Sequence, residues 1–230
     1  MKILSIDTTT KSLTLGVYND GIEAEYNLEV GRLLSHVLDK TVERVVDASG
    51  VALQEIDYFA LGLGPGSFTG MRVGISFVKG LSWANNKPII GISTLDILAQ
   101  HIKENGLPII SAIDAKRKLI YACVYKKKSG QLRKISPYML LTIDELIKKA
   151  PKGSIILGDA ISLYKEKLQK DIKSSVLLDK EFWYPKAHNI IALALQRIKA
   201  KKFNSAFNIK PIYLYPKFCL LVLRWRCLSY

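Results

Sequence analysis

Two aspartates stand where an apolar stretch runs into a polar turn. Asp7 closes the segment KILSID, and Asp114 closes PIISAID. A carboxylate in this position can hold a metal-bound nucleotide, or it can accept hydrogen bonds from the backbone of its own turn. Thr9 occupies the place where a glycine would let a phosphate approach. We therefore expect Asp7 to cap its turn, with a nucleotide cleft as the alternative.

A second candidate is the glycine-rich stretch LGLGPGSFTGMRVG at residues 61–74. A Walker loop needs lysine and serine or threonine after its last glycine, but Met71 and Arg72 follow Gly70. A dinucleotide fingerprint fails because Ser67 stands where its third glycine belongs. Either backbone N–H groups bind an anion at the start of the next helix, or the glycines permit close packing of strand and helix. The candidate nucleotide-cleft or anion-loop residues are Asp7, Gly64, Gly66, Ser67, Thr69 and Gly70.

Other catalytic and metal-binding patterns are missing from the sequence. The three histidines, His36, His101 and His188, form no HxxxH or HExxH pair. No GxSxG nucleophile motif and no CxxC pair occur. Cys123 lies in an apolar strand, where we expect it to be buried, and His36 is expected on the polar face of a helix. The residues therefore predict no metal site and no catalytic group.

Composition and charge narrow the class of protein. The chain has 230 residues, 49% of them hydrophobic, and a formal net charge of +14. No apolar run approaches the ~20 residues that span a bilayer, and the start MKILSIDTTT does not resemble a secretory signal. We expect a reduced, cytoplasmic protein without a membrane. The positive clusters at residues 126–128, 148–149 and 199–202 are typical of solvated loops and helix ends or of a surface for an acidic partner.

Apolar runs and turn signals predict a chain that alternates strands and helices. Strands are expected at residues 2–6, 13–18, 22–28, 58–63, 89–92, 154–157 and 175–178 and within 108–128. Helices are expected at 33–48, 69–85, 94–104, 143–149, 160–169 and 187–201. Ser67 or Thr69 is the expected cap of the second helix.

The second half of the chain repeats the pattern of the first. Laying Ile113 on Ile6 without a gap brings Ile120 onto Leu13, and both segments read as strand, aspartate, polar turn and strand. This favours a two-lobed α/β fold with duplicated mixed-sheet lobes. We expect an N-terminal lobe at 1–106 and a C-terminal lobe at 107–217, whose last helix can pack back on the first lobe. Residues 218–230 form an atypical apolar and basic tail.

Two helices of the first lobe carry a wide apolar surface. The apolar residues of the helix at 33–48 span more than the ~100° stripe that a surface helix buries, and the helix at 69–85 is apolar nearly all round. We expect a partner subunit to cover the surplus, with the chain's own C-terminal segment as the alternative cover. The predicted interface residues are Leu33, Leu34, Val37, Leu38, Thr41, Val45, Arg72, Ile75 and Lys79.

Several segments together resemble one known family, the bacterial TsaB (YeaZ) family. They are ILSIDTTT, GLGPGSFTGMRVG, VKGLSWANNKPIIGISTLDILA, DAKRKLIYACVY, Gly158-Asp159 and PKAHNIIALAL, and the similarity runs from about Lys2 to Cys219. The resemblance implies an actin/Hsp70-like (ASKHA, RNase H-like) fold. It also implies a cytoplasmic, non-catalytic subunit for making threonylcarbamoyladenosine beside the anticodon of tRNAs that read ANN codons. The tail departs from the family pattern and could be an appendage, a partner-binding segment or the product of an altered reading frame.

The resemblance further implies partners and cofactors. The catalytic subunit is the paralogue TsaD, and the ATPase TsaE docks on the pair. The chain alone is expected to form a homodimer through the same first-lobe helices. ATP and a divalent metal are expected in the partner subunits and no cofactor in this chain alone. A stand-alone ATPase or small-molecule kinase of the same fold is the alternative, and an RNA-binding module is a third interpretation. Lys126, Lys127 and Lys128 are a candidate path for tRNA once the partner is bound.

Overall fold

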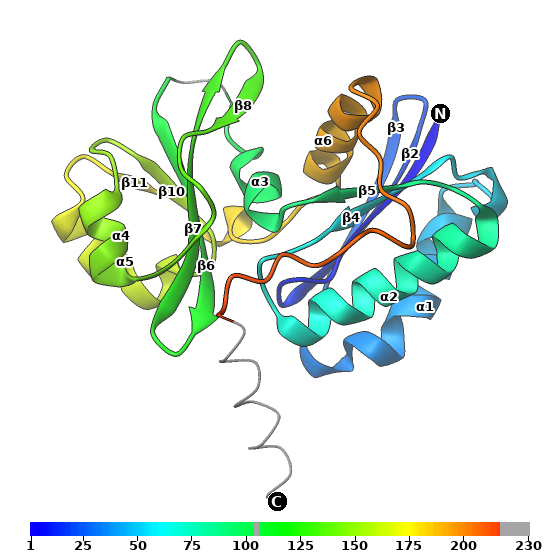
Figure 1. Ribbon diagram of the computed structural model, residues 1–230, viewed down its shortest axis with the longest axis horizontal. Coiled ribbons are helices and arrows are strands. Elements are labelled where there is room, and N and C mark those ends of the chain that lie inside the picture. The colour runs from blue at the N-terminus through cyan, green and yellow to red at the C-terminus, as the bar shows by residue number, and fades with distance from the viewer. Residues whose placement is uncertain (104–105, 217–230) are drawn as a thin grey trace, which may run out of the picture.

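The computed structural model of the protein describes residues 1–103 and 106–216, so the tail at 218–230 lies outside the described residues. Two mixed β-sheets form two lobes, and helices cover both faces of each sheet (Figure 1). The predicted two-lobed α/β fold is therefore confirmed. None of the helices in the described ranges is both long and apolar enough to cross a membrane.

The first sheet has the strand order β3-β2-β1-β4-β5. Its strands are β1 (Lys2–Asp7), β2 (Ser12–Asn19), β3 (Ile22–Glu29), β4 (Tyr58–Gly62) and β5 (Ile89–Ile92). β1, β2 and β3 pair antiparallel, whereas β4 and β5 continue the sheet in parallel on the other side of β1. The helices α1 (Leu34–Ala48) and α2 (Phe68–Asn85) cover its outer face.

The second sheet repeats this order as β8-β7-β6-β10-β11. Its strands are β6 (Pro108–Lys116), β7 (Leu119–Lys128), β8 (Gln131–Lys134), β10 (Ile155–Leu157) and β11 (Val176–Leu177), and β9 (Met139–Thr142) also pairs with β7. The helices α4 (Ile143–Lys149) and α5 (Ile161–Asp171) cover its outer face. The sequence missed β8 and β9, because the charged residues around β8 show no apolar alternation.

The two sheets share their topology, but the ungapped alignment of the two halves is wrong by one residue where it lays β6 on β1. Ile6 faces α1 and α2, whereas Ile113 faces the opposite side of its sheet, where α3 (Thr94–Ala99) packs. A bulge near the end of β6 restores the phase, since Ile120 faces α4 and α5 just as Leu13 faces α1 and α2. An ungapped alignment cannot anticipate a bulge, and a slip of one residue moves a strand side chain to the other face.

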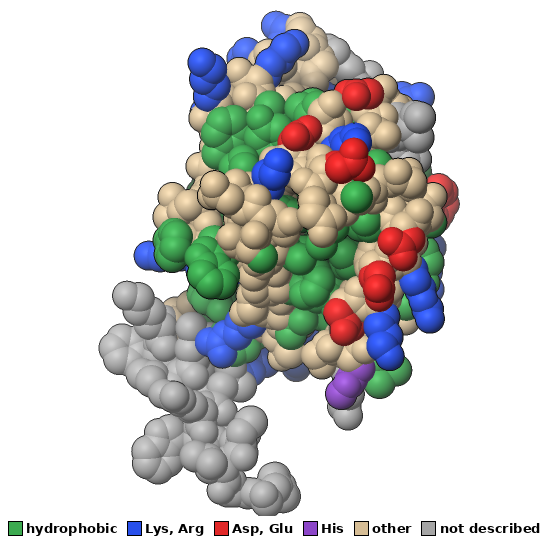
Figure 2. Space-filling model, turned by 90° about the vertical axis from the view of Figure 1, so that its right-hand side faces the viewer, with side chains coloured by type: hydrophobic (Ala, Val, Ile, Leu, Met, Phe, Trp, Pro, Cys, Tyr) green, Lys and Arg blue, Asp and Glu red, His purple; other side chains and the backbone are tan. Residues whose placement is uncertain are grey.

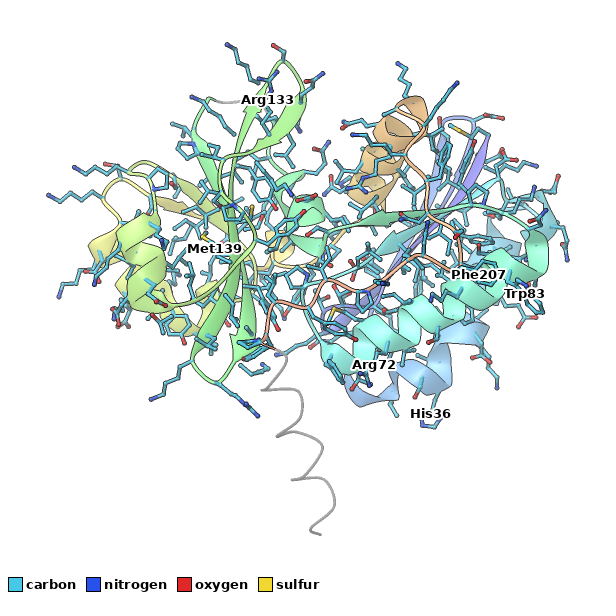
Figure 3. The ribbon with its side chains drawn as sticks, viewed as in Figure 1. His36, Arg72, Trp83, Arg133, Met139 and Phe207 are labelled. Carbon is cyan, nitrogen blue, oxygen red and sulfur yellow. The ribbon has the colours of Figure 1, made fainter. Side chains whose placement is uncertain are left out.

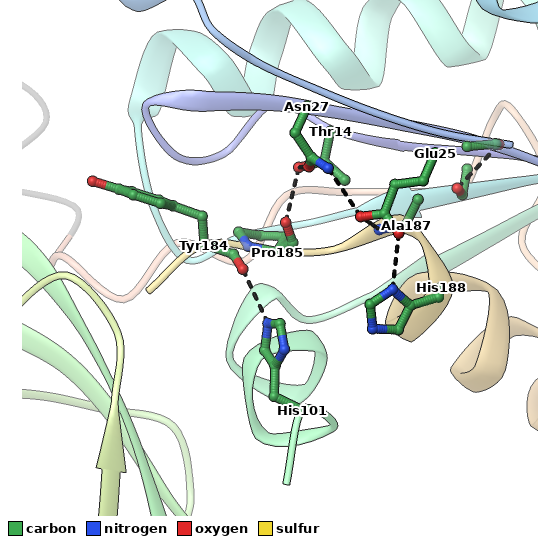
Figure 4. Close-up of polar contacts among 10 residues, drawn as sticks. Thr14, Glu25, Asn27, His101, Tyr184, Pro185, Ala187 and His188 are labelled. Carbon is green, nitrogen blue, oxygen red and sulfur yellow. Dashed lines mark hydrogen bonds and ion pairs between the residues drawn. The ribbon is translucent and has the colours of Figure 1, made fainter. Parts of the chain in front are cut away.

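Each lobe places its last helix on the sheet of the other lobe. α3 follows β5 but packs on β6 and β7, and α6 (Ala187–Lys199) follows β11 but packs on the first sheet. Glu25 of β3 holds the start of α6, because it accepts a hydrogen bond from the Ala187 N–H at 3.1 Å and pairs with His188 at 2.8 Å (Figure 4). Burial opposes the charge of Glu25, but hydrogen bonds from Asn27 and His188 outweigh it and lower its pKa.

His101 lies just after α3 and joins this contact between the lobes (Figure 4). Its Nε2 bonds to the Tyr184 carbonyl oxygen at 3.1 Å, and its ring meets the Phe182 ring edge-on. Burial lowers the pKa of His101 to about 4. The neutral ring therefore donates its Nε2–H to Tyr184, which ties α3 to the loop that leads into α6.

Most predicted elements are present, and their ends follow local signals. α2 ends at Asn85, and Asn86 takes the left-handed conformation with φ of 50°. α4 begins with a capping box, in which Glu145 accepts from the Thr142 N–H at 2.8 Å. The helix predicted at 94–104 ends early, at Ala99. Short 3₁₀ helices occur at Gly31–Leu33, Leu53–Glu55 and Lys180–Phe182.

Candidate functional site

Asp7 ends β1 and is completely buried. Its Oδ1 accepts hydrogen bonds from the backbone N–H and the hydroxyl of Thr9 at 2.7 and 2.8 Å. Its Oδ2 accepts a hydrogen bond from the Thr94 hydroxyl at 3.2 Å. Burial raises the pKa of Asp7 to about 6, although the hydrogen bonds from Thr9 and Thr94 act in the opposite direction. The hydrogen bond from the Thr9 N–H confirms that Asp7 caps its own turn.

The glycine loop between β4 and α2 lies directly on this turn. A Cβ added at Gly66 would lie 2.1 Å from the Thr9 carbonyl oxygen, and one added at Gly70 would lie 2.0 Å from the Thr8 carbonyl oxygen. Gly64 has a φ of +89°, and its Cβ would lie 2.2 Å from the Met71 sulfur. Only glycine fits at Gly66 and Gly70, because backbone carbonyls occupy the space of a side chain there, and only glycine adopts the φ of Gly64 without strain.

Hydrogen bonds hold the loop on the turn. The Ser67 N–H donates to the Thr9 carbonyl at 2.7 Å, and the Thr8 hydroxyl donates to the Gly70 carbonyl at 2.7 Å. Ser67 Oγ accepts from the Gly70 N–H at 3.2 Å, so Ser67 caps α2, while Thr69 is exposed. The N–H groups of Ser67 and Gly70 thus bond within the protein, which favours close packing over an anion at this helix start.

The turn after β6 carries the second candidate acid. The Asp114 N–H donates to Asp159 Oδ1 at 2.8 Å, and the Asp114 carboxylate accepts from the Lys116 N–H and pairs with its ammonium. Burial raises the pKa of Asp159. Lys116, Arg117 and Lys118 all adopt positive φ, at 65°, 53° and 61°. Left-handed backbone costs a non-glycine residue about 1–2 kcal/mol, and such strain concentrates at functional sites.

A cavity of about 740 Å³ lies between the two turns. Its walls combine cationic side chains with aromatic ones, including Lys11, Lys116, Arg117, Phe68, Tyr121 and Tyr215, and they also contain the acids Asp114 and Asp159. This chemistry suits a planar ligand with negative charge. Of the predicted cleft residues, Gly66 and Ser67 line the cavity, whereas Asp7 is sealed behind its turn.

The described part of the chain contains no group of three or more His, Cys, Asp or Glu side chains that could hold a metal ion. His36 is exposed on α1 and Cys123 is buried in the second lobe, as the sequence predicts. Cys219 and Cys227 lie outside the described residues.

The predicted partner surface is less apolar than the sequence suggests. Several predicted interface residues are buried within the first lobe itself, namely Leu34, Leu38, Thr41, Val45 and Ile75. The premise of a surplus apolar face on α1 is corrected by this finding, because the sheet and the neighbouring α2 together cover its wide apolar stripe. The outward side of α1 is polar and charged, with residues such as Asp39, Lys40, Glu43 and Arg44 exposed.

A smaller apolar surface remains open on this side of the lobe. Leu33 is 61% exposed, Val37 and Lys79 are half-buried, and Arg72 is exposed. Sequence reasoning missed Trp83, which is 73% exposed although its helical position places it on the stripe of Arg72 and Lys79. Figure 3 shows Arg72 and Trp83 near opposite ends of α2. Figure 2 shows apolar side chains gathered on this face beside an edge of mixed charge.

The C-terminal segment covers one flank of α2 (Figure 1). Asn204 pairs with Ile89 at the edge of β5, and the Ile212 N–H donates to the Leu63 carbonyl at 2.9 Å. The Tyr213 hydroxyl accepts from Arg72 Nε at 3.3 Å, and its ring lies against that of Phe68. The chain's own C-terminal segment therefore covers this flank of α2, as the alternative expectation had it, while the outward stripe of α2 stays open.

Comparisons with known proteins agree over most of the chain. Residues 28–219 match the family model of TsaD, tRNA N6-adenosine threonylcarbamoyltransferase. The tRNA threonylcarbamoyladenosine biosynthesis protein TsaB of Escherichia coli K12 is 29% identical, over 93% of this chain and 94% of that protein. Its namesake from Bacillus subtilis 168 is 30% identical, over 74% of this chain and 76% of that protein. Among solved structures, YeaZ from Pseudomonas aeruginosa superposes with a TM-score of 0.82 at 27% identity, covering 93% of this chain and 99% of that one.

Proposed function

The chain belongs to the TsaB family of tRNA threonylcarbamoyladenosine biosynthesis proteins, and we propose that it is the non-catalytic subunit that binds and activates a TsaD-type partner. In this proposal the partner holds ATP and a divalent metal. It transfers the threonylcarbamoyl group to the adenosine beside the anticodon of tRNAs that read ANN codons. We place the complex in the cytoplasm, with a TsaE-type ATPase docking on the pair.

The closed contact between the Asp7 turn and the glycine loop is the observation that carries this division of labour. The backbone of Thr8 and Thr9 fills the space over Gly66 and Gly70 that an approaching phosphate would need. Asp7 is buried behind this contact, and its carboxylate accepts hydrogen bonds from Thr9 and Thr94. These features suit a lobe that supports a partner's nucleotide chemistry and does not perform its own.

The outward stripe of α2, together with the exposed Leu33 just before α1, is the surface that we assign to the partner. Leu33 and Trp83 together leave apolar surface open to water, and Arg72 and Lys79 add positive charge beside it. The match of this chain to the TsaD family model supports a partner with the same topology, because related subunits can pair through related surfaces. A second copy of the chain covers the same surface when the partner is absent.

Size-exclusion chromatography with light scattering tests the association. We expect a homodimer from the chain alone and a heteromer with the TsaD-type partner. Leu33→Asp should abolish both, because burying an unpaired carboxylate in an apolar contact is strongly unfavourable. Leu163→Asp is the matched control, since Leu163 is 58% exposed on α5 of the other lobe. A strictly monomeric chain that ignores the partner overturns the proposal, and so does equal behaviour of the two variants.

A stand-alone ATPase of the same fold is the second candidate, and the cavity between the lobes is the observation that favours it. Lys11, Lys116 and Arg117 line that cavity together with aromatic rings, as a site for an anionic planar ligand would require. This candidate predicts ATP hydrolysis by the isolated chain, and it predicts that Arg117→Gln, a change in the cavity wall, lowers the turnover.

A further inference from the structure

The β7–β8 hairpin projects from the second lobe as a two-stranded ribbon (Figure 1). Lys126 lies directly opposite Arg133, and Lys128 lies opposite Gln131. Side chains alternate between the faces of a strand, so Lys126, Lys128 and Arg133 share one face of the ribbon. All three are exposed, and Figure 3 shows Arg133 near the outer end of the hairpin. We refer to Lys126, Lys128 and Arg133 as the cationic ribbon face.

Lys127 belongs to the other face and has a different role. Its ammonium group donates to the Ile102 carbonyl at 3.0 Å and lies 3.4 Å from Gln100 Oε1. These contacts tie the ribbon to the segment after α3. The sequence groups Lys126, Lys127 and Lys128 as one cluster, whereas the structure removes Lys127 from the outward face and adds Arg133 to it.

Within the described residues, the charges of the cationic ribbon face have no ion-pair partner. Like charges directly opposite each other, with Cβ atoms about 5 Å apart, destabilise an antiparallel pair. Among the ion pairs of residues 1–103 and 106–216, none includes Lys126, Lys128 or Arg133. The basic cluster at 199–202 differs, because Lys199 lies in the last turn of α6, where a cation stabilises the helix dipole.

Two basic surfaces therefore lie at one end of the molecule, one on each lobe. Figure 1 draws the β8 hairpin and the end of α6 at the same end of the two lobes. Lys199, Lys201 and Lys202 are exposed there. A long polyanion that lies along this end of the molecule can contact both surfaces. Of the two, the ribbon is the one whose charges do not stabilise the fold.

We propose that the cationic ribbon face binds the phosphate backbone of tRNA within the complex with the TsaD-type partner, an inference that rests on the proposed function. Lys126 and Lys128 stand ~6.6 Å apart along the strand, in a row that suits a linear polyanion. The ribbon face carries no aromatic residue for base stacking, so the contact is to phosphates and has no sequence preference. RNA is favoured over an acidic protein because tRNA is the substrate that the complex must hold.

The test compares two triple variants in the assembled complex. Lys126→Gln, Lys128→Gln and Arg133→Gln are combined in the first variant. The control combines Lys148→Gln, Lys149→Gln and Lys165→Gln, which remove the same charge from exposed positions of α4 and α5. Affinity for unmodified tRNA is measured by fluorescence anisotropy over a series of salt concentrations. Each lost phosphate contact lowers the slope of log K against log salt by about 0.7–0.9, so the ribbon variant should lose about 2–3 units of slope and the control none.

Several outcomes separate the possible failures. Equal slopes for the ribbon variant and the wild type overturn the inference, as does an equal loss in the control. A ribbon variant that keeps its tRNA affinity but loses the TsaE-type ATPase identifies an acidic protein surface and also overturns it. Failure of the wild-type chain to join the partner, seen by light scattering, rejects the proposed function instead. Removing the opposed charges should not lower the melting temperature, and Lys128→Gln alone provides a second variant at a position without an opposed cation.

Discussion

Gly74 in α2 offers a quantitative test of the contact between helix and turn. A Cβ added at Gly74 would lie 2.1 Å from Thr8 Oγ1 and 3.3 Å from Thr8 Cβ, whereas ordinary contacts begin at 3.4 Å. Thr8 is buried and its hydroxyl already bonds the Gly70 carbonyl, so it cannot move without its backbone. Overpacking of this kind costs about 1–3 kcal/mol, and alanine regains about 1 kcal/mol over glycine in a helix. We therefore expect Gly74→Ala to lower the free energy of unfolding by up to about 2 kcal/mol.

Gly80 is the matched control on the same helix. It is exposed, and nothing lies within 4 Å of its added Cβ, so Gly80→Ala should stabilise the protein by about 0.5–1 kcal/mol. Thr8→Ala removes the atom that Gly74→Ala overlaps, so the double variant should recover at least about 1 kcal/mol relative to the sum of the single changes. Urea denaturation of the wild type and the four variants measures these differences. If Gly74→Ala matches Gly80→Ala, or if Thr8→Ala brings no relief, the loop does not pack on the turn as described.

Four further variants test the pH dependence and the core. Burial raises the pKa of Asp7 from 3.8 to about 6. Protonated Asp7 therefore contributes its full stability below pH 4, and the free energy of unfolding falls by about 3 kcal/mol as the pH rises through 6. Asp7→Asn should remove this fall, as measured by urea titrations at pH 4 and 8. Burial lowers the pKa of His101 from 6.5 to about 4. Neutral His101 therefore contributes its full stability above pH 6.5, and the free energy of unfolding falls by about 3 kcal/mol as the pH falls through 4. His101→Gln should reduce this loss of stability in acid, and an unchanged loss would contradict the burial of the ring. Leu38→Ala should cost about 2–5 kcal/mol, as for a core residue. Leu33→Ala should change the free energy of unfolding of the monomer by less than about 0.5 kcal/mol, measured at a protein concentration too low for the chain to dimerise.

Most strands and helices could be predicted from the sequence because their ends carry clear local signals. Ser67 caps α2, Asn86 ends it, and the capping box at Thr142 starts α4. The contact between Asp7 and its own turn could also be predicted, because a short carboxylate before Thr9 has a backbone N–H within reach. These features depend on neighbours a few residues apart.

Features that depend on distant parts of the chain could not be predicted from the sequence. The apolar stripe of α1 is as wide as a partner interface requires, but α2 and the sheet cover Leu38 and Val45, and no local pattern shows that two helices lie side by side. The bulge in β6 moves Ile113 to the unexpected face. The cavity is lined by residues from both lobes and from the C-terminal segment, among them Lys11 and Tyr215, which no motif connects.

The central claim is that this chain supports catalysis without performing it. The most direct measurement is the rate of threonylcarbamoyl transfer to tRNA by a reconstituted system that contains the TsaD-type partner, the ATPase, and either the wild-type chain or Asp7→Asn. The account predicts no product from this chain alone and the same rate for both chains in the full system, because Asp7 only caps a buried turn. Product from the isolated chain would contradict the account, and so would a loss of transfer by orders of magnitude in an Asp7→Asn complex that still assembles.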